Sequence, residues 1–304
     1  MDIGFRWGVV RYFARTRAVL IVGALAWTAA AAQSPPPLPQ PALQLLANGQ
    51  VLAAAAGPDG SVVIGGNFTI VNGTARSYIA RLQPGGTLDP TWNPAADGPV
   101  QALTVDGSGA VYAGGSFANI GGQPRRFVAK LSGTGTGAAV ASWNPGADTS
   151  VLALVADNGG NIYAGGYFQI IGGLSRSYIA KLSAAGGATD TSWNPGANDA
   201  VFALAVDGSG MVYAGGRFST MGAQTRNGIA RISGSTGAVD PGWDPDAGTG
   251  GAVEALAVTG NSALYAGGVF DSIGGQARSN LAKLVISTGA ADPLWNPSPD
   301  RPVT

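Results

Sequence analysis

A period of about fifty residues restricts the fold of this chain more than any other feature of its sequence. Aligning the chain on itself sets six valines in register. They are Val51, Val100, Val151, Val201, Val253 and Val303, at spacings of 49, 51, 50, 52 and 50 residues. Fixed periods of about 20 to 50 residues are typical of solenoids, propellers and arrays. Residues 51–302 are therefore expected to form five copies of one unit, with residues 303–304 opening a sixth.

Each copy reads as four short strands joined by turns. In the fourth copy, residues 201–207 are an apolar run, residues 207–210 are a turn and residues 211–218 form the hairpin partner. A loose Gly-bearing loop, a third run at residues 227–233 and a short fourth strand around residues 238–243 follow. Gly and Pro interrupt each copy too often for a pair of helices.

These patterns predict an all-β protein, a β-propeller of five four-stranded blades of about 50 residues. The strands are expected to run from the inside of each blade to the outside in chain order, because the first two are rich in small residues. A parallel β-helix is the alternative, since two coils of about 25 residues could share one period.

The N-terminal segment has the pattern of a secretory signal. Residues 1–32 contain a basic stretch ending at Arg17, an apolar run and a cleavage pattern at Ala30-Ala31-Ala32. Residues 33–50 form a Pro-rich linker and lead-in. The apolar run is short against the ~20 residues that cross a bilayer, so no stable membrane span is expected after cleavage. The predicted location is secreted, periplasmic or at the cell surface.

Composition excludes several classes of chemistry. The chain has no Cys and no His, so disulfides, thiolate nucleophiles, Ser-His-Asp triads and His-ligated metals are ruled out. Beyond the leader, 13 basic and 16 acidic residues leave a net charge of −3 without a basic run, which disfavours a nucleic-acid partner. No Gly-Gly segment continues into a phosphate loop, and no cofactor is expected.

Four short sequence motifs recur in the same order in the copies. In the second copy they are VYAGGSF (111–117), IGG (120–122), VAKLS (128–132) and SWNPGAD (142–148). The chain resembles the delta-60 repeat, a bacterial β-propeller repeat, over about residues 51–302. The resemblance implies a propeller, an exported or surface protein, and no assigned catalytic residues. One departure is Val140, which stands where the other copies have Asp.

Two large side chains recur once per copy, and each has two possible roles. The tryptophans could join each blade to the next, or their faces could bind sugar rings. The arginines could donate to loop carbonyls, or could form a ring that grips an acidic glycan. The residues are Trp92, Trp143, Trp193, Trp243 and Trp295, and Arg76, Arg125, Arg176, Arg226 and Arg278.

Aspartates recur in the turn after the first strand of a copy, at Asp59, Asp106, Asp157 and Asp207. Calcium takes about six to eight oxygen ligands, and one carboxylate per turn falls short of that number. These aspartates are therefore expected to stabilise turns, and no metal site is predicted.

Positions whose residue differs between copies are better candidates for a functional role, because the repeat symmetry does not require those residues. One such position precedes a repeated Phe and is occupied by Asn67, Ser116, Tyr167, Arg217 and Val269. Another follows the first Val and is occupied by Leu52, Gln101, Leu152, Phe202 and Glu254. Tyr167, Arg217 and Glu254 are the candidates for a surface that contacts a partner.

The sequence thus favours a non-catalytic, exported or cell-surface scaffold that binds a protein or polysaccharide partner. The alternative is a multivalent lectin that uses the repeated Trp and Arg residues. A glycan-active enzyme ranks third, because it needs two carboxylates about 5 to 10 Å apart and Glu254 is the only Glu in the chain. No catalytic residue is predicted, and the oligomeric state is left open.

Overall fold

The computed structural model describes residues 45–304, and all regular structure in this range is β. The predicted signal peptide at residues 1–32 and the linker up to residue 44 lie outside the described residues. In the described range, no helix has the length and apolar character needed to cross a membrane.

Residues 45–304 contain five three-stranded antiparallel sheets, which are the blades and are numbered 1 to 5 in chain order. The innermost strands are β1 (Val51–Ala56), β6 (Val100–Val105), β11 (Val151–Ala156), β16 (Val201–Val206) and β21 (Ala252–Thr259). The middle strands are β2 (Val62–Gly66), β7 (Val111–Gly115), β12 (Asn161–Gly166), β17 (Met211–Gly216) and β22 (Ala263–Val269). The outer strands are β5 (Ile79–Leu82), β10 (Val128–Leu131), β15 (Ile179–Ser183), β20 (Ile229–Ser233) and β25 (Leu281–Val285).

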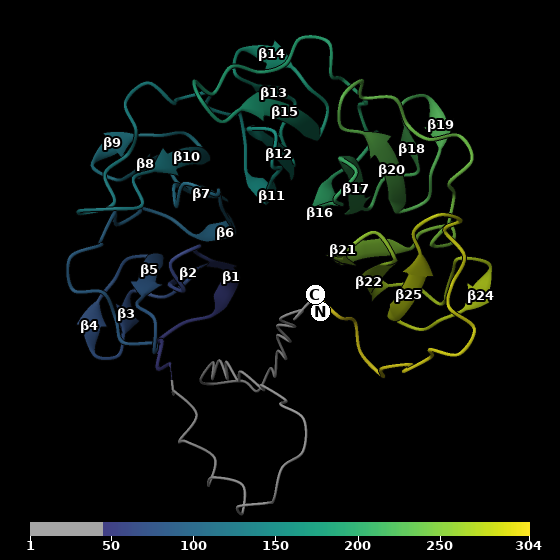
Figure 1. Ribbon diagram of the computed structural model, residues 1–304, viewed down its shortest axis with the longest axis horizontal. Helices are drawn as coiled ribbons and strands as arrows, with labels where there is room; N and C mark the ends of the chain where they lie inside the picture. The colour runs from purple at the N-terminus through teal and green to yellow at the C-terminus, as the bar shows by residue number, and fades with distance from the viewer. Residues whose placement is uncertain (1–44) are drawn as a thin grey trace, which may run out of the picture.

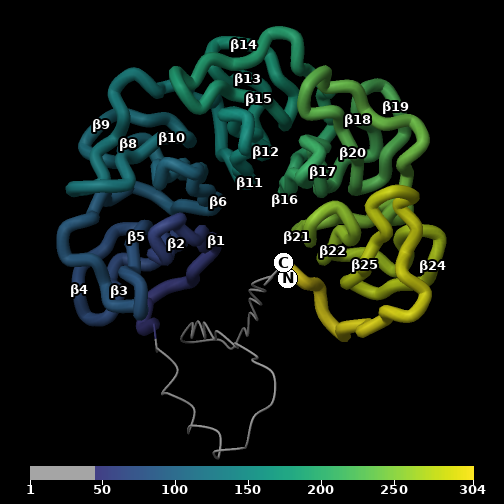
Figure 2. The backbone as a smooth tube through the Cα atoms, in the orientation of Figure 1, coloured from purple at the N-terminus to yellow at the C-terminus, as the bar shows by residue number. Residues whose placement is uncertain are grey.

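The blades are arranged around an axis with their innermost strands facing it (Figure 1). Consecutive innermost strands contact one another in the order β1, β6, β11, β16 and β21. The predicted propeller and its inner-to-outer strand order are confirmed, and the β-helix alternative is wrong, because strands of one copy pair with each other. The described blades form an arc, with blade 1 and blade 5 on either side of an open sector (Figure 2).

The fourth strand predicted around residues 238–243 does not form as a strand. Val239 makes a single bridge to Ile232 of β20, and equivalent bridges occur in the other four blades described. After this bridge the Asp240 carboxylate accepts the backbone N–H of Gly242, and Pro241 between them has no N–H to donate. The chain therefore leaves the sheet after one paired residue.

The predicted loose loop after each repeated Phe is instead a short hairpin. The hairpins are β3 (Ile70–Val71) with β4 (Thr74–Ala75), β8 (Asn119–Ile120) with β9 (Gln123–Pro124), β13 (Ile170–Ile171) with β14 (Leu174–Ser175), β18 (Thr220–Met221) with β19 (Gln224–Thr225), and β23 (Ser272–Ile273) with β24 (Gln276–Ala277). The chain before each of the blades 1 to 4 bridges to the hairpin of that blade. Residues 45–50, assigned from sequence to the lead-in, do the same through a bridge from Ala47 to Val71.

The hydrophobic core lies in layers between consecutive blades. One layer joins Trp92 and Val63 of blade 1 to Val100 and Val111 of blade 2. Three similar layers follow between the later blades. Each blade is thus a sheet packed face to face against its neighbours, as in other stacked sheets.

The Ala-Gly-Gly end of each middle strand allows the next blade to approach closely. A Cβ on Gly165 would lie 2.6 Å from Cγ1 of Val201, the first residue of the next innermost strand. The same contact recurs at the other junctions, and Val303 takes the equivalent place against Gly267 of blade 5. The valines that mark the period are therefore the residues through which each blade packs against the preceding blade.

Candidate functional site

The repeated tryptophans are placed between blades. Trp92, Trp143, Trp193 and Trp243 are fully buried, and Trp295 is partly exposed. The indole N–H groups of Trp92, Trp143 and Trp193 donate to a carbonyl of the following blade, each at 2.9 Å. These contacts are the joining role anticipated from the sequence. The four buried rings have no face open to a sugar in this structure.

The repeated arginines are buried as well, and they hold loops. Nη2 of Arg76 donates to the carbonyl of Asp89 at 2.7 Å, and Nη1 donates to the carbonyl of Ala75 at 2.8 Å. Arg125, Arg176, Arg226 and Arg278 make the corresponding pair of bonds. Since all five are no more than 6% exposed, they do not form an open cationic ring.

The turn aspartates organise the hairpin between the innermost and middle strands. Asp207 accepts from the backbone of Ser209 and Met211 and from the hydroxyl of Tyr213 at 2.8 Å. Burial alone would raise the pKa of Asp207, but these hydrogen bonds and that of the Ser209 hydroxyl lower it below its usual range. In residues 45–304 no three potential ligand side chains come together as a metal site requires.

Asp59 does not belong with these aspartates. Gly57, rather than Asp59, occupies the position of Asp106 in the turn, since Gly57 bonds to Ser61 as Asp106 bonds to Ala110. Asp59 accepts only from the backbone and hydroxyl of Ser61. The prediction that Asp59 is equivalent to the turn aspartates of the other copies was therefore wrong, because Asp59 stands two residues after their position.

The position after the first Val is a β-bulge in every blade described. The pairing of innermost and middle strands shifts there, as between Val201 and Ala203 or between Val253 and Ala255. A bulge leaves one residue unpaired and re-aims its side chain. The bulged residues lie at the same end of the innermost strands, around the axis.

Four of these bulged side chains line one cavity with Tyr167. The cavity has a volume of about 330 Å³ and is lined by Gln101, Leu152, Tyr167, Phe202 and Glu254, which we call the axial patch. These residues come from blades 2 to 5. Two of the three residues selected from sequence, Tyr167 and Glu254, are thus brought together.

The third selected residue, Arg217, lies at the rim. Its guanidinium carbon is 5.8 Å from the centroid of Phe202, whose ring meets that of Tyr167 edge to face at 6.1 Å. Nε of Arg217 also donates to the Asp199 carboxylate at 3.1 Å. Burial alone would raise the pKa of Asp199, but the Ala200 N–H and Arg217 lower it, so Asp199 is an anion at neutral pH.

The axial patch combines an aromatic wall, an amide and the Glu254 carboxylate, and the ion pair of Arg217 with Asp199 adds charges of both signs at its rim. Tyr167 is 44% exposed, so its ring is available to another molecule. Aromatic rings flanked by a guanidinium and a carboxylate suit a partner that has both apolar and polar groups. Sequence reasoning missed Asp199 as a member of this group, because its ion pair with Arg217 crosses 18 residues.

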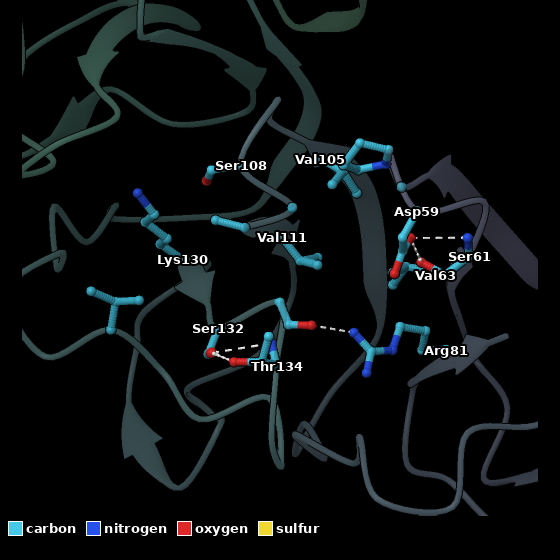
Figure 3. Close-up of a pocket in the computed structure, with 16 residues that line it drawn as sticks. Asp59, Ser61, Val63, Arg81, Val105, Ser108, Val111, Lys130, Ser132 and Thr134 are labelled. Atoms are coloured by element: carbon cyan, nitrogen blue, oxygen red, sulfur yellow. Dashed lines mark hydrogen bonds between the residues drawn. The ribbon is translucent and has the colours of Figure 1, made fainter.

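A second cavity lies between blade 1 and blade 2, at the other end of the innermost strands (Figure 3). It has a volume of about 480 Å³. Val63 and Arg81 of blade 1 line one side, and Val111, Ser132 and Thr134 of blade 2 line the other.

The arrangement of blades defines the chain as a β-propeller built from repeats. Residues 57–91 match the family model described as a domain of unknown function (DUF5122) beta-propeller. Over these residues the match confirms the resemblance to the delta-60 repeat that was inferred from the recurring sequence motifs. No curated protein matches the sequence.

A solved WD40 domain shows the same fold class. The WD40 domain of Neurospora crassa Pan2 aligns with a TM-score of 0.52 at 13% identity, covering 84% of this chain and 66% of that one. A protein of unknown function from Bacteroides caccae aligns with a TM-score of 0.47 at 11% identity, covering 95% of each chain. The extracellular domain of a putative one-component system from B. thetaiotaomicron aligns with a TM-score of 0.46 at 12% identity, covering 80% of this chain and 28% of that one.

Proposed function

We propose that this protein is a non-catalytic, exported or cell-surface scaffold that binds a protein or polysaccharide partner through the axial patch. One observation carries the proposal. Four blades each contribute a different bulged side chain to one cavity, whereas the tryptophans and arginines that hold the blades together are the same in every copy. Symmetry explains the repeated residues, and binding explains the residues that depart from it. The export part of the proposal rests on the leader pattern in residues 1–32.

The charge state of Asp199 fits a residue that pairs with a cation rather than the acid of a hydrolytic pair. A glycan-hydrolysing pair needs one carboxyl group with a raised pKa as its acid. The pKa of Asp199 at the rim is lowered, because the Ala200 N–H and Arg217 outweigh the effect of burial. Asp199 therefore holds Arg217 in place rather than supplying a proton.

The lectin hypothesis loses its proposed contacts at Trp92, Trp143, Trp193 and Trp243, because those rings are buried. A sugar unit of a polysaccharide could still stack on Tyr167, which is exposed beside Phe202. Carbohydrate recognition is thus included in the proposal as a single axial site.

The proposal is tested by screening the full chain against a glycan array and a phage-displayed peptide library. We expect selected ligands to bind the Tyr167→Ala/Arg217→Ala variant at least about tenfold more weakly, which is ~1.4 kcal/mol. Ile170→Ala is the matched control, since Ile170 is 48% exposed on the outer hairpin of the same blade as Tyr167. Failure to select any ligand, or ligands that bind the double variant unchanged, would contradict the proposal.

A further inference from the structure

The cavity between blade 1 and blade 2 occupies a place that a tyrosine fills elsewhere in the arc. Tyr112, Tyr163 and Tyr213 each stand on a middle strand and face the next blade, at most 1% exposed. Each ring packs on the tryptophan of its own blade at 5.2 to 5.4 Å between centroids. In these three blades the phenol is part of the layer between the sheets.

The hydroxyl groups of these tyrosines have defined partners. Tyr112 donates to Asp106 at 3.0 Å and to the carbonyl of Ala184 in the next blade at 3.3 Å. Tyr163 donates to Asp157 at 3.2 Å and to the carbonyl of Gly234 at 3.1 Å. Burial raises the pKa of Tyr112, as does Asp106, so the hydroxyl keeps its proton.

Blade 1 has neither the tyrosine nor the aspartate of this arrangement. Val63 pairs with Arg81 in the sheet as Tyr112 pairs with Lys130, so Val63 stands at the tyrosine position. Gly57 stands at the position of Asp106, as described above. The substitution of a valine for a tyrosine removes a ring from this layer, and the cavity of about 480 Å³ lies beside Val63.

The carbonyl that would accept a phenol hydroxyl is nevertheless present. In blades 2 and 3 the basic residue of the outer strand bonds to one carbonyl of the next blade: Lys130 to Ala184 and Lys181 to Gly234. Arg81 bonds in the same way to Gly133, which identifies the Gly133 carbonyl as the counterpart of the two tyrosine acceptors. Gly133 lines the cavity together with Val63 and Arg81.

We propose that this cavity binds a phenol group, with the ring between blades 1 and 2 against Val63 and the hydroxyl donating to the Gly133 carbonyl. The volume is within the range of about 300 to 1,000 Å³ that is usual for small-molecule sites. The partly buried Val105 and Val140 supply apolar surface, and Asp59 and Ser108 supply polar groups, whereas Val63 and Val111 are each 1% exposed. The site is distinct from the axial patch, because it lies at the opposite end of the innermost strands.

The test is calorimetric titration of the full chain with p-cresol, with toluene as the same ring lacking a hydroxyl. We expect saturable binding of p-cresol, at least fivefold weaker binding of toluene, and at least a tenfold loss of p-cresol affinity in Val63→Tyr, whose side chain fills the space. Val269→Tyr is the matched control, since Val269 is 46% exposed outside this cavity, and it should bind p-cresol unchanged.

If Val63→Tyr does not fold, Val63→Leu serves instead and should weaken p-cresol binding by a smaller factor. The absence of saturable binding to the unsubstituted chain would overturn the proposal, as would equal affinities for p-cresol and toluene. Unchanged binding by the folded Val63 variants would also overturn it. Titration with N-acetyl-tyrosinamide distinguishes the sources: binding equal to that of p-cresol assigns the cavity to tyrosine side chains, and binding of p-cresol alone assigns it to free phenols.

Discussion

The tryptophan that recurs in every copy has different surroundings in different blades. Trp193 is fully buried and donates to the Ser233 carbonyl of the next blade, whereas Trp295 of blade 5 is partly exposed and packs on Tyr265. We predict that Trp193→Ala lowers the free energy of unfolding by about 3 to 5 kcal/mol. Trp295→Ala should lower it by about 1 to 2 kcal/mol, because less apolar surface is lost.

Urea unfolding of the two variants beside the unsubstituted chain measures both losses. The comparison controls for the chemistry of the substitution, since the residue removed and the residue introduced are the same. Equal losses would contradict the assignment of the buried tryptophans to the layers between blades.

Much of the residue-scale picture could be predicted from the sequence. The period identified the repeated Trp and Arg residues, and a structural role was one of the two considered for them; contacts such as Arg76 to the Asp89 carbonyl are of that kind. The cavity beside Val63 was not predicted, although the period sets Val63 in register with Tyr112. The signal was the loss of one aromatic ring in one copy. The cavity could be inferred from this loss only once the structure had shown that the ring lies between blades.

At the scale of the strand and turn, sequence patterns identified the three strands that pair over four or more residues. The outer hairpins were not predicted, because two-residue strands such as Ile170–Ile171 are too short for an alternating pattern. The fourth strand was predicted but reduces to one bridge, since Asp240 and Pro241 turn the chain away. The bulge that directs Phe202 to the axial patch could not be predicted, because no sequence pattern indicates it.

The turn that replaces the fourth strand makes stability depend on pH. In blade 3, Asp190 accepts from the hydroxyl and N–H of Ser192 and pairs with Lys181 at 3.3 Å. The Ser192 hydroxyl, and then the Ser192 N–H and Lys181, overcome the effect of burial and lower the pKa of Asp190 to about 2. An unfolded Asp has a pKa of about 3.9. The stabilisation is therefore complete above about pH 4 and lost as the pH falls towards about 2.

We predict that Asp190→Asn lowers the free energy of unfolding at neutral pH, and that the difference from the unsubstituted chain shrinks between about pH 4 and 2. Urea unfolding at a series of pH values measures this difference. The subtraction removes the contributions of the other aspartates, whose carboxylates are unchanged in both chains. A difference that stays constant down to pH 2 would show that the Asp190 carboxylate is not the stabilising group.

Over the whole molecule, the described blades differ in the number of neighbours. Blade 3 packs between blades 2 and 4, whereas blades 1 and 5 stand at the two ends of the arc (Figure 1). In repeat proteins, stability is approximately the sum of terms for each unit and each interface. We predict that backbone amides of β12 exchange with deuterium more slowly than those of β2 and β22. Uniform protection across the five middle strands would contradict an open arc.

The side chains that depart from the repeat symmetry at the axial patch are expected to serve binding and not stability. The measurement that tests this expectation most directly follows thermal unfolding and ligand titration of Tyr167→Ala/Arg217→Ala side by side, using a ligand selected on the unsubstituted chain. We expect an unfolding midpoint within about 2 °C of the unsubstituted chain and binding at least about tenfold weaker. A lowered midpoint with unchanged affinity would show that these side chains hold the blades together, and would contradict the expectation.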